Sequence, residues 1–456
     1  MNLSHLLNER AEQDRPIRVG LIGAGKFGTM FLSQVRMTPG MHLLAVADLD
    51  VNRARAALIE TGWSEDRISA TSSAKALAQG STWITDDSEA LINAGGLDVV
   101  IEATGVPEAG IRHALSAFQR GRHVVIVNVE ADVLVGPLLK QKADAAGVVY
   151  TLAYGDQPSL IAEQVDWARS IGLEVIAAGK GTLYMPEFHA STPDTVWNHY
   201  GLTAERAAAS GMNAKMFNSF LDGTKSAIEM AAVANACGLN APAGGLSFPP
   251  CGTAKLASTL IPSSAGGILD QKGQVEVVSS RTRDGIDIPD NLRWGVYVTF
   301  EAPTDYVKRC FSDYGLVTDP SGRYSALWRP YHLIGLELGV SVAWAGLLSL
   351  PTGAPREWKG DVVAVAKRDL EAGEKLDGEG GFTVWGRLMT ARDSRDADAV
   401  PIGLAHGVSL KHQLPKDAVI CWSDVDTPAD SVAYRTRREM EKLYGFDTPA
   451  AARGAA

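Results

Sequence analysis

The feature that most constrains this fold is a glycine-rich turn between an apolar run and a helix-like segment. The stretch VGLIGAGKFGTMF, residues 19–31, places Gly23, Gly25 and Gly28 in the spacing G-x-G-x-x-G. Glycines in this spacing also occur in ordinary tight turns. Here they follow an expected strand and open an expected helix, where free backbone N–H groups and the helix dipole hold a pyrophosphate. The stretch therefore predicts a dinucleotide-binding domain.

Short apolar runs alternate with helix-like stretches from Ile17 to about residue 155. The runs are IRVGLIGAG, HLLAVADLD, LDVVIEATG, RHVVIVNVE and GVVYTLAYGD. Strands that alternate with helices are typical of a parallel sheet covered by helices. We therefore expect a doubly wound α/β domain over residues 1–155.

Side chains near the glycine turn are expected to select the dinucleotide. Asp48 ends the second strand, about 20 residues after the third glycine, where a carboxylate accepts hydrogen bonds from a ribose 2′-hydroxyl. Its charge would repel a 2′-phosphate, so the sequence favours NAD over NADP. Arg53 and Arg55 follow on a helix, where each is either a surface charge or a partner for a 2′-phosphate.

A second turn, in IEATGVPE, ends the third expected strand with Thr104 and Gly105. Ligands of open α/β sheets lie beyond the carboxyl ends of the strands. This turn is therefore expected beside the nicotinamide ribose, and a plain strand-to-helix turn is the alternative. The complete expected cofactor set is Gly23, Gly25, Lys26, Phe27, Gly28, Asp48, Arg53, Thr104, Gly105 and Asn128.

The pattern changes after residue 155. Ala-rich helix-like segments and glycine-rich loops over residues 156–350 predict an α+β domain. The stretch LPTGAPREWKG, residues 350–360, is typical of a linker. Short apolar runs split by Gly and Pro follow it and predict a small all-β module over residues 358–430. The tail DTPAAARGAA has little bulk to pack and is expected to fray.

Several charged residues are candidates for catalysis. Glu130 and Asp132 follow the strand HVVIV, and Asp156 and Ser159 flank the turn that leaves the first domain. A catalytic or orienting role and a merely solvated carboxylate are equal alternatives for these acids. Lys180 lies between glycines in AAGKGTLY, where it can approach a bound anion.

The segment FLDGTKSAIEMAAVAN places Asp222, Lys225 and Glu229 at offsets of three and four, which predicts one face of a helix. Their neighbours are apolar, so the charges must be paired or used. Lys225 is expected to polarise a substrate carbonyl or exchange a proton, and Asp222 to orient it. The alternative is a solvated pair worth about 0.3–0.5 kcal/mol. The expected catalytic set is Lys225, Asp222, Glu130, Asp156 and Lys180.

A further group, Arg329, Tyr331 and His332, lies in LWRPYHLIGLE between apolar runs. Arginine suits a phosphate or carboxylate, and histidine relays protons near neutral pH. A structural network that closes one domain onto another is the favoured explanation of the same residues.

Composition excludes several other classes of protein. The formal charge of −10, with no run of like charges, argues against a nucleic-acid partner. The 4 cysteines are far apart, which argues against a zinc knuckle or a disulfide framework and favours a cytoplasmic protein. No window is apolar enough to span a membrane, and no spacing of carboxylates singles out a metal site. We expect a small-molecule substrate.

A set of motifs occurs in order over about residues 3–430. The motifs are GLIGAGKFGT, IEATGVPEAG, VNVEADVLVGPLLK, YGDQPS, AGKG, FLDGTKSAIEMAAVANACGL, RPYHL and VVAVAKRDLEAGEKLD. In this order the chain resembles the 1-deoxy-D-xylulose 5-phosphate reductoisomerase-like proteins. These are relatives of homoserine dehydrogenase that carry a C-terminal SAF domain, which is a β-clip module.

The resemblance implies an NAD(P)-dependent oxidoreductase with a Rossmann domain, a homoserine-dehydrogenase-like middle domain and a SAF module. It also implies a homodimer or higher homo-oligomer through the middle domain. Asp222 and Lys225 look like the acid and lysine of homoserine dehydrogenases, with D-x-x-K here in place of D-x-x-x-K. Glu130 stands near the place of a further lysine of that family, which counts against homoserine as substrate.

The resemblance leaves the substrate open. 1-Deoxy-D-xylulose 5-phosphate is one candidate, and a homoserine-dehydrogenase-like or sugar and polyol dehydrogenase is the alternative. The relatives have basic residues after the second strand, consistent with NADPH, whereas this chain has ADLDVNR. A different class, a dinucleotide-binding sensor or assembly protein, would not need the charged set of the middle domain.

Overall fold

The computed structural model describes residues 2–445 and divides into two compact units. Unit 1 combines Met1–Leu160 with His332–Arg356, and unit 2 combines Ile161–Tyr331 with the chain from Glu357 onward. The expected division into three domains stays a prediction. The tail that was expected to fray lies outside the described residues.

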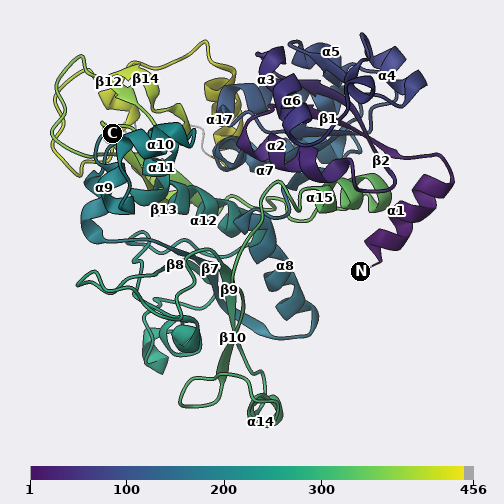
Figure 1. Ribbon diagram of the computed structural model, residues 1–456. Helices are drawn as coiled ribbons and strands as arrows, with labels where there is room; N and C mark the ends of the chain where they lie inside the picture. Colours follow the sequence, from purple (N-terminus) through teal and green to yellow (C-terminus); the bar gives the residue numbers. More distant parts are fainter. Residues whose placement is uncertain (1, 446–456) are drawn as a thin grey trace. The chain divides into compact units, whose positions relative to one another are not determined.

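Unit 1 is built on a six-stranded parallel sheet in the order β3-β2-β1-β4-β5-β6. Figure 1 labels β1 and β2 of this sheet. Its strands are β1 (Ile17–Ile22), β2 (Met41–Ala47), β3 (Trp83–Thr85), β4 (Val99–Glu102), β5 (His123–Ile126) and β6 (Tyr150–Leu152). The order reverses between β1 and β4, as in dinucleotide-binding sheets. The predicted doubly wound sheet is confirmed. The sequence analysis did not predict strand β3, because its three residues are too few to show a strand pattern.

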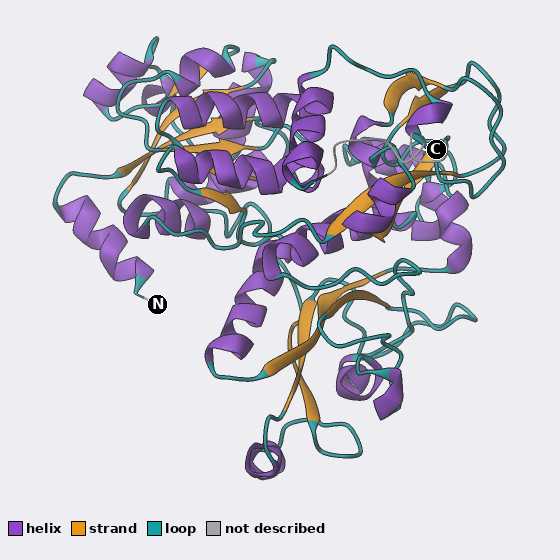
Figure 2. Cartoon of the chain, turned by 180° about the vertical axis from the view of Figure 1, so that it is seen from behind, coloured by secondary structure: helices purple, strands orange, loops and turns teal. Residues whose placement is uncertain are grey.

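The strands of this sheet are apolar on both faces because helices cover both sides, as Figure 2 shows. In β4, the side chains of Val99, Val100 and Ile101 have no exposed surface. The helices of unit 1 are α1 (Leu3–Glu12), α2 (Lys26–Val35), α3 (Val51–Glu60), α4 (Ser73–Gln79), α5 (Ser88–Ile92), α6 (Pro107–Gln119), α7 (Val129–Ala145) and α15 (Gly339–Ala343).

The segment that returns to unit 1 packs on the same core. Leu338 and Val342 belong to the buried cluster that contains Val19 of β1. The Leu152 N–H at the end of β6 donates to the Gly353 carbonyl at 2.7 Å. Part of the stretch expected as a linker, residues 350–360, is therefore bound to unit 1.

Unit 2 contains a mixed four-stranded sheet in the order β10-β9-β7-β8. Its strands are β7 (Glu174–Thr182), β8 (Gln274–Ser279), β9 (Val296–Glu301) and β10 (Tyr324–Arg329). Strands β7 and β8 run parallel, and the other neighbours run antiparallel. Helices and strands in this segment agree with the expected α+β character.

The C-terminal segment adds two two-stranded sheets, β11 with β13 and β12 with β14. The bounds are β11 (Gly360–Ala366), β12 (Lys375–Asp377), β13 (Val384–Thr390) and β14 (His406–Ser409). Helix α12 (Thr224–Cys237) lies against β11 and β13, and the Gly386 N–H of β13 donates to Thr224 Oγ1 at 2.8 Å. The short strands expected here thus share one core with the middle of the chain.

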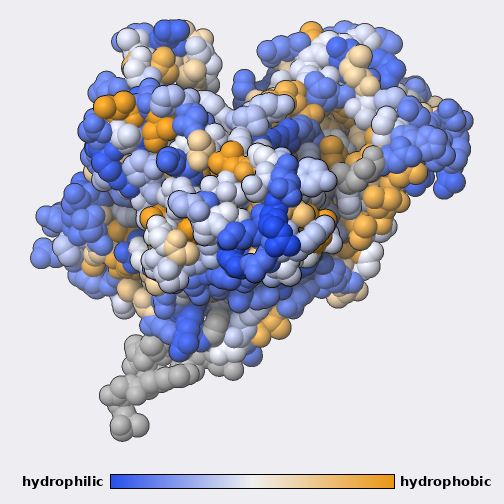
Figure 3. Space-filling view, turned by 90° about the horizontal axis from the view of Figure 1, so that it is seen from below, coloured by the Kyte–Doolittle hydropathy of each residue, from blue (hydrophilic) through white to orange (hydrophobic). Residues whose placement is uncertain are grey.

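The remaining helices complete the description. They are α8 (Gln157–Ser170), which runs from unit 1 into unit 2, and α9 (Val196–Tyr200), α10 (Ala204–Ala209), α11 (Ala214–Leu221), α13 (Leu256–Thr259), α14 (Asp305–Asp313), α16 (Ala391–Asp396) and α17 (Val432–Leu443). No helix within residues 2–445 is long and apolar enough to cross a lipid bilayer. On the face drawn in Figure 3, hydrophobic residues stand in separate groups among hydrophilic ones.

Candidate functional site

The glycine turn of unit 1 is shaped by close contacts that leave one position open. A Cβ on Gly23 would lie 2.7 Å from the Ala103 carbonyl oxygen, and one on Gly28 would lie 2.3 Å from the Gly23 carbonyl oxygen. Gly23 also has a left-handed φ of 99°. At Gly25, by contrast, a Cβ would meet no atom within 4 Å. Gly25 is the N-cap of α2, so the open space faces the free N–H groups of a helix start.

The second expected turn also has an open glycine. Gly105 has a φ of 67°, and a Cβ there would meet no atom within 4 Å. Because this turn follows β4 and the first turn follows β1, both open glycines lie at the point where the strand order reverses. Lys26 is exposed and Phe27 half-buried in the first turn of α2. This arrangement fits the pyrophosphate and ribose of a dinucleotide.

Asp48 is buried and holds the turn together. Its Oδ2 accepts the Ala24 N–H at 2.8 Å, and its Oδ1 accepts the Asp50 N–H at 2.9 Å. Arg53 also donates to Oδ1, at 2.5 Å. A carboxylate has about four acceptor sites, so these contacts leave one on Oδ2. From the sequence, Asp48 and Arg53 were expected to favour different dinucleotides, NAD and NADP. In the structure they form an ion pair with each other.

Arg55 and Leu49 complete this edge of unit 1. Arg55 pairs with Glu65 at 2.5 Å, away from Asp48. Leu49, directly after Asp48, is 94% exposed. An apolar side chain held in solvent beside the ribose acceptor is a candidate wall for an adenine ring. The sequence analysis missed Leu49, because one leucine in a loop carries no pattern.

A buried carboxylate supports the second turn. Glu102, the last residue of β4, has no exposed surface, and its Oε1 accepts the Thr104 hydroxyl at 2.5 Å and faces His113 Nδ1 at 3.3 Å. Asn128, the N-cap of α7, donates from Nδ2 to the Val106 carbonyl at 3.0 Å. Thr104 and Asn128 are therefore joined to one polar cluster. Glu102 is a positioning residue that the sequence analysis missed.

Asp132 is a second fully buried acid of unit 1. Its Oδ1 accepts the Tyr150 hydroxyl at 2.9 Å, and its Oδ2 has no hydrogen-bond partner. Burial raises the pKa of Asp132 to about 7, and the Tyr150 hydrogen bond opposes that shift. Burial and the adjacent Asp132 raise the pKa of the Tyr150 hydroxyl.

Two other acids expected for catalysis lie in unit 1. Glu130 is in the first turn of α7, where the helix dipole favours a carboxylate. Asp156 is buried at the start of α8, and its Oδ1 accepts the Gln157 N–H at 2.9 Å. Both therefore follow strand ends, as expected.

The expected alignment of Asp222, Lys225 and Glu229 on one helix face is wrong for Asp222, whereas Lys225 and Glu229 lie four residues apart on α12 as expected. Helix α11 ends at Leu221, Asp222 caps it, and Gly223 with a φ of 91° separates it from α12. A left-handed glycine ends a helix, so Asp222 leaves the face that the spacing implied. Lys225 is half-buried in the first turn of α12.

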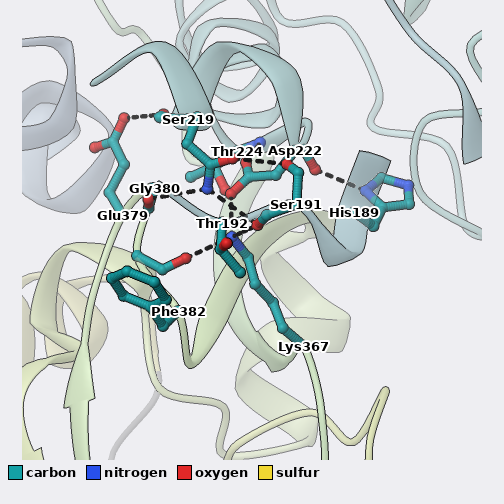
Figure 4. A network of polar contacts seen from close by, with 12 residues as sticks. His189, Ser191, Thr192, Ser219, Asp222, Thr224, Lys367, Glu379, Gly380 and Phe382 are labelled. Carbon is teal, nitrogen blue, oxygen red and sulfur yellow. Dashed lines mark hydrogen bonds and ion pairs between the residues drawn. The ribbon is translucent and has the colours of Figure 1, made fainter. Parts of the chain in front are cut away.

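The charged groups of unit 2 form two buried ion pairs. Lys180 of β7 contacts Glu229 of α12, and both side chains are buried. The Lys367 ammonium donates to Asp222 Oδ2 at 2.7 Å, and also to the Ser191 and Gly381 carbonyls at 2.8 and 2.7 Å (Figure 4). Lys367 lies far from Asp222 in sequence, so no local motif predicts it.

His189 is held by the same network. Its Nδ1–H donates to the Asp222 backbone carbonyl at 2.7 Å (Figure 4). Its Nε2 accepts the Tyr184 hydroxyl at 2.9 Å. The ring stacks on Trp385 with centroids 4.0 Å apart. Burial lowers the pKa of His189 below its ordinary value, so the imidazole is neutral at pH 7. A lone histidine in MPEFHAS gives no signal in the sequence.

Of Arg329, Tyr331 and His332, the first two belong to unit 2 and His332 begins the segment that returns to unit 1. The Arg329 guanidinium lies 5.3 Å from the centre of the Tyr331 ring, a stacking contact that fits a structural role. Among residues 2–445, no group of three or more His, Cys, Asp or Glu side chains is placed to hold a metal ion.

The strand order and the open glycine turns of unit 1 fit a dinucleotide, and comparison with known proteins adds one family match. Residues 155–338 match the family described as oxidoreductase DRL, catalytic domain. No curated protein matches the chain. The family match covers less than half of the chain, and it marks this segment as similar to the catalytic domain of an oxidoreductase.

Solved structures of dehydrogenases are similar over part of the chain. They include scyllo-inositol dehydrogenase from Lactobacillus casei with bound NAD(H) and scyllo-inositol, at 12% identity over 62% of this chain and 73% of that chain, with a TM-score of 0.33. Another is the WlbA dehydrogenase from Bordetella pertussis in complex with NADH and UDP-GlcNAcA, at 18% identity over 38% and 48%, with a TM-score of 0.27. Apo scyllo-inositol dehydrogenase from Lactobacillus casei is matched over 46% of its length, at 15% identity over 37% of this chain, with a TM-score of 0.26. The chain thus spans less than half of the latter two structures, and TM-scores below 0.5 carry no conclusion on activity.

Proposed function

We propose that the chain transfers a hydride between a nicotinamide dinucleotide and a carbonyl or alcohol carbon of a small polar substrate. The nicotinamide supplies the hydride chemistry when the dinucleotide is bound. The observation that carries the proposal is the open space at Gly25 beside the start of α2, in a parallel sheet whose order reverses at that point. The buried carboxylate of Asp48 adds an acceptor for the adenine ribose.

We propose that NAD is the preferred dinucleotide. The free acceptor site on Asp48 Oδ2 suits a ribose 2′-hydroxyl, and a 2′-phosphate would meet the carboxylate there. Arg53 already neutralises Oδ1 from the solvent side, with 58% of its side chain exposed. We expect a ratio of Kd values of about ten- to a hundredfold in favour of NAD, equivalent to about 1.4–2.8 kcal/mol.

Titration of the full chain with NADH and with NADPH tests this preference. Asp48→Ala also removes the acceptor of the Ala24 N–H, so both dinucleotides should bind more weakly and the ratio of Kd values is the readout. That ratio should shrink in Asp48→Ala and stay unchanged in the matched variant Arg55→Ala, whose partner is Glu65. A wild-type chain that binds NADPH more tightly would contradict the preference and favour a reductive, biosynthetic direction.

We propose that Lys225 is the proton donor or acceptor at the substrate oxygen. It is half-buried at the start of α12, three residues after Asp222, whose carboxylate Lys367 and the Thr224 N–H hold in place. Asp222 has no exposed surface, so its proposed role is to position this helix start. Lys180, Glu130 and Asp156 remain proposed orienting groups.

We also propose four broader properties. The ordered motifs support a reductoisomerase-like substrate such as 1-deoxy-D-xylulose 5-phosphate and a C-terminal SAF module over residues 358–430. The same resemblance supports a homodimer, and the isolated cysteines support a cytoplasmic location. A substrate screen at the nicotinamide absorbance, with and without a divalent cation, tests the substrate. Analytical ultracentrifugation tests the homodimer, and a monomer would contradict it.

A further inference from the structure

Unit 2 contains a cavity of about 250 Å³ that none of the expected catalytic residues lines. Its lining includes His189, Gly245, Trp385, Arg387 and Asp417. Trp385 and Arg387 are two residues apart on β13, so their side chains lie on one face of that strand. The cavity is therefore walled by β13, by the His189 ring stacked on Trp385 and by two loops.

The polar groups on this wall have few partners within the described residues. The Arg387 guanidinium donates one hydrogen bond there, to the Met389 sulfur at 3.8 Å, and no carboxylate of residues 2–445 lies within ion-pair distance of it. The Trp385 indole Nε1 is buried and makes no hydrogen bond with any described residue. A half-buried cation and a buried donor without acceptors are costly, and such groups are usually satisfied by a ligand or water.

The cavity lining also includes a negative charge, Asp417. Asp417 is an exposed residue, and no cation of residues 2–445 lies within ion-pair distance of it. It adopts a left-handed φ of 65°, which aspartate tolerates better than most residues, and its N–H donates to the Ala366 carbonyl at 2.9 Å. The carboxylate is therefore open to solvent and to a ligand in the cavity.

A glycine loop lies against the arginine. A Cβ on Gly245 would be in ordinary van der Waals contact with Arg387 Cγ, at 3.5 Å. Gly245 has a φ of 83°, which L side chains rarely adopt, so a substitution would strain this loop through its backbone. His189 cannot turn away, because both ring nitrogens are hydrogen-bonded.

We propose that this cavity binds a small oxyanion that also carries a hydroxyl group, either a hydroxycarboxylate or a hydroxylated phosphate ester. Arg387 and the Trp385 N–H bind the oxyanion, because guanidinium and N–H donors match its oxygens. Asp417 accepts the hydroxyl proton. The Trp385, His189 and Phe248 rings form the apolar part of the wall. The site does not depend on the choice of dinucleotide.

Isothermal titration of the full chain without dinucleotide tests the site. The probes are D-glycerate, glycerol 3-phosphate and glycerol. We expect saturable binding of one or both anions and none of glycerol, and the two anions distinguish a carboxylate from a phosphate ligand. Arg387→Ala should raise the Kd at least tenfold. Arg392→Ala, which removes an exposed arginine of α16, should leave the Kd unchanged.

Two further variants keep the test decisive. Arg387→Lys retains the positive charge but lacks the planar guanidinium, so it should raise the Kd by an intermediate factor. This variant also tests the site if Arg387→Ala does not fold. Asp417→Asn tolerates the left-handed backbone and should reduce the preference for D-glycerate over propionate. The proposal is overturned if neither anion binds saturably at millimolar concentration, or if Arg387→Ala and Arg387→Lys bind as the wild type does. A failure of NADH binding would leave this result unaffected.

Discussion

The buried carboxyl of Asp132 should make the stability of unit 1 depend on pH. Its Oδ1 accepts the Tyr150 hydroxyl, and its Oδ2 has no partner. Ionisation therefore places a charge in the core with one hydrogen bond to stabilise it. The pKa of Asp132 is about 7 in the fold, against an ordinary value of 3.8.

The sign of the effect follows from these two pKa values. Between pH 3.8 and about 7 the unfolded chain releases this proton and the folded chain retains it, so stability falls as the pH rises. The difference corresponds to about 4 kcal/mol at alkaline pH, at about 1.36 kcal/mol per pKa unit. From pH 5 to pH 8 the free energy of unfolding should fall by roughly 2–3 kcal/mol through this group alone. For a unit of this size that is a fall in Tm of roughly 5–10 °C.

Asp132→Asn is the matched perturbation, because an amide oxygen still accepts the Tyr150 hydroxyl and never ionises in this range. Thermal melts of wild type and variant at pH 5 and pH 8 should show a smaller fall for the variant. Asp144→Asn, at an exposed position of the same helix, should melt like the wild type at both values. Parallel pH profiles for wild type and Asp132→Asn would refute the reasoning.

The other predictions concern the charged groups of unit 2. Lys225→Ala should abolish turnover on any active substrate while dinucleotide Kd values stay unchanged, and unchanged turnover would remove Lys225 from the mechanism. Lys367→Met leaves the Asp222 carboxylate buried without its cation and should cost about 3–5 kcal/mol of unfolding free energy in urea melts. Lys272→Met breaks an exposed pair with Glu174 and a pair with the half-buried Glu301, and it should cost about 1 kcal/mol or less because the Lys272 side chain itself is 40% exposed. Equal losses in these two lysine variants would contradict the burial argument.

The sequence predicted the parts of this protein that follow from local pattern. The G-x-G-x-x-G turn, the alternation of strands and helices and the acid after the second strand all depend on residues close together in the chain. The structure has each of them in unit 1, with Gly23 and Gly28 in the tight contacts that exclude a side chain.

The parts that depend on distant contacts were not predictable. Lys367 pairs with Asp222 across 145 residues of sequence, and no spacing rule connects them. The Arg387 and Asp417 charges became candidates only when the fold placed them on one cavity. One error was avoidable, since the glycine after Asp222 is the usual signal for the end of a helix.

The central claim is that the glycine turn of unit 1 binds a nicotinamide dinucleotide. Gly25→Asp tests it most directly, because Gly25 has an ordinary φ of −74° and open space at its Cβ, and aspartate is a favourable N-cap. The variant should therefore fold normally while its carboxylate repels the pyrophosphate. The matched control is Gly95→Asp, at another open glycine of unit 1. Titration with NADH should show a loss of binding of at least a hundredfold in Gly25→Asp and none in Gly95→Asp, whereas wild-type affinity in a folded Gly25→Asp chain would contradict the claim.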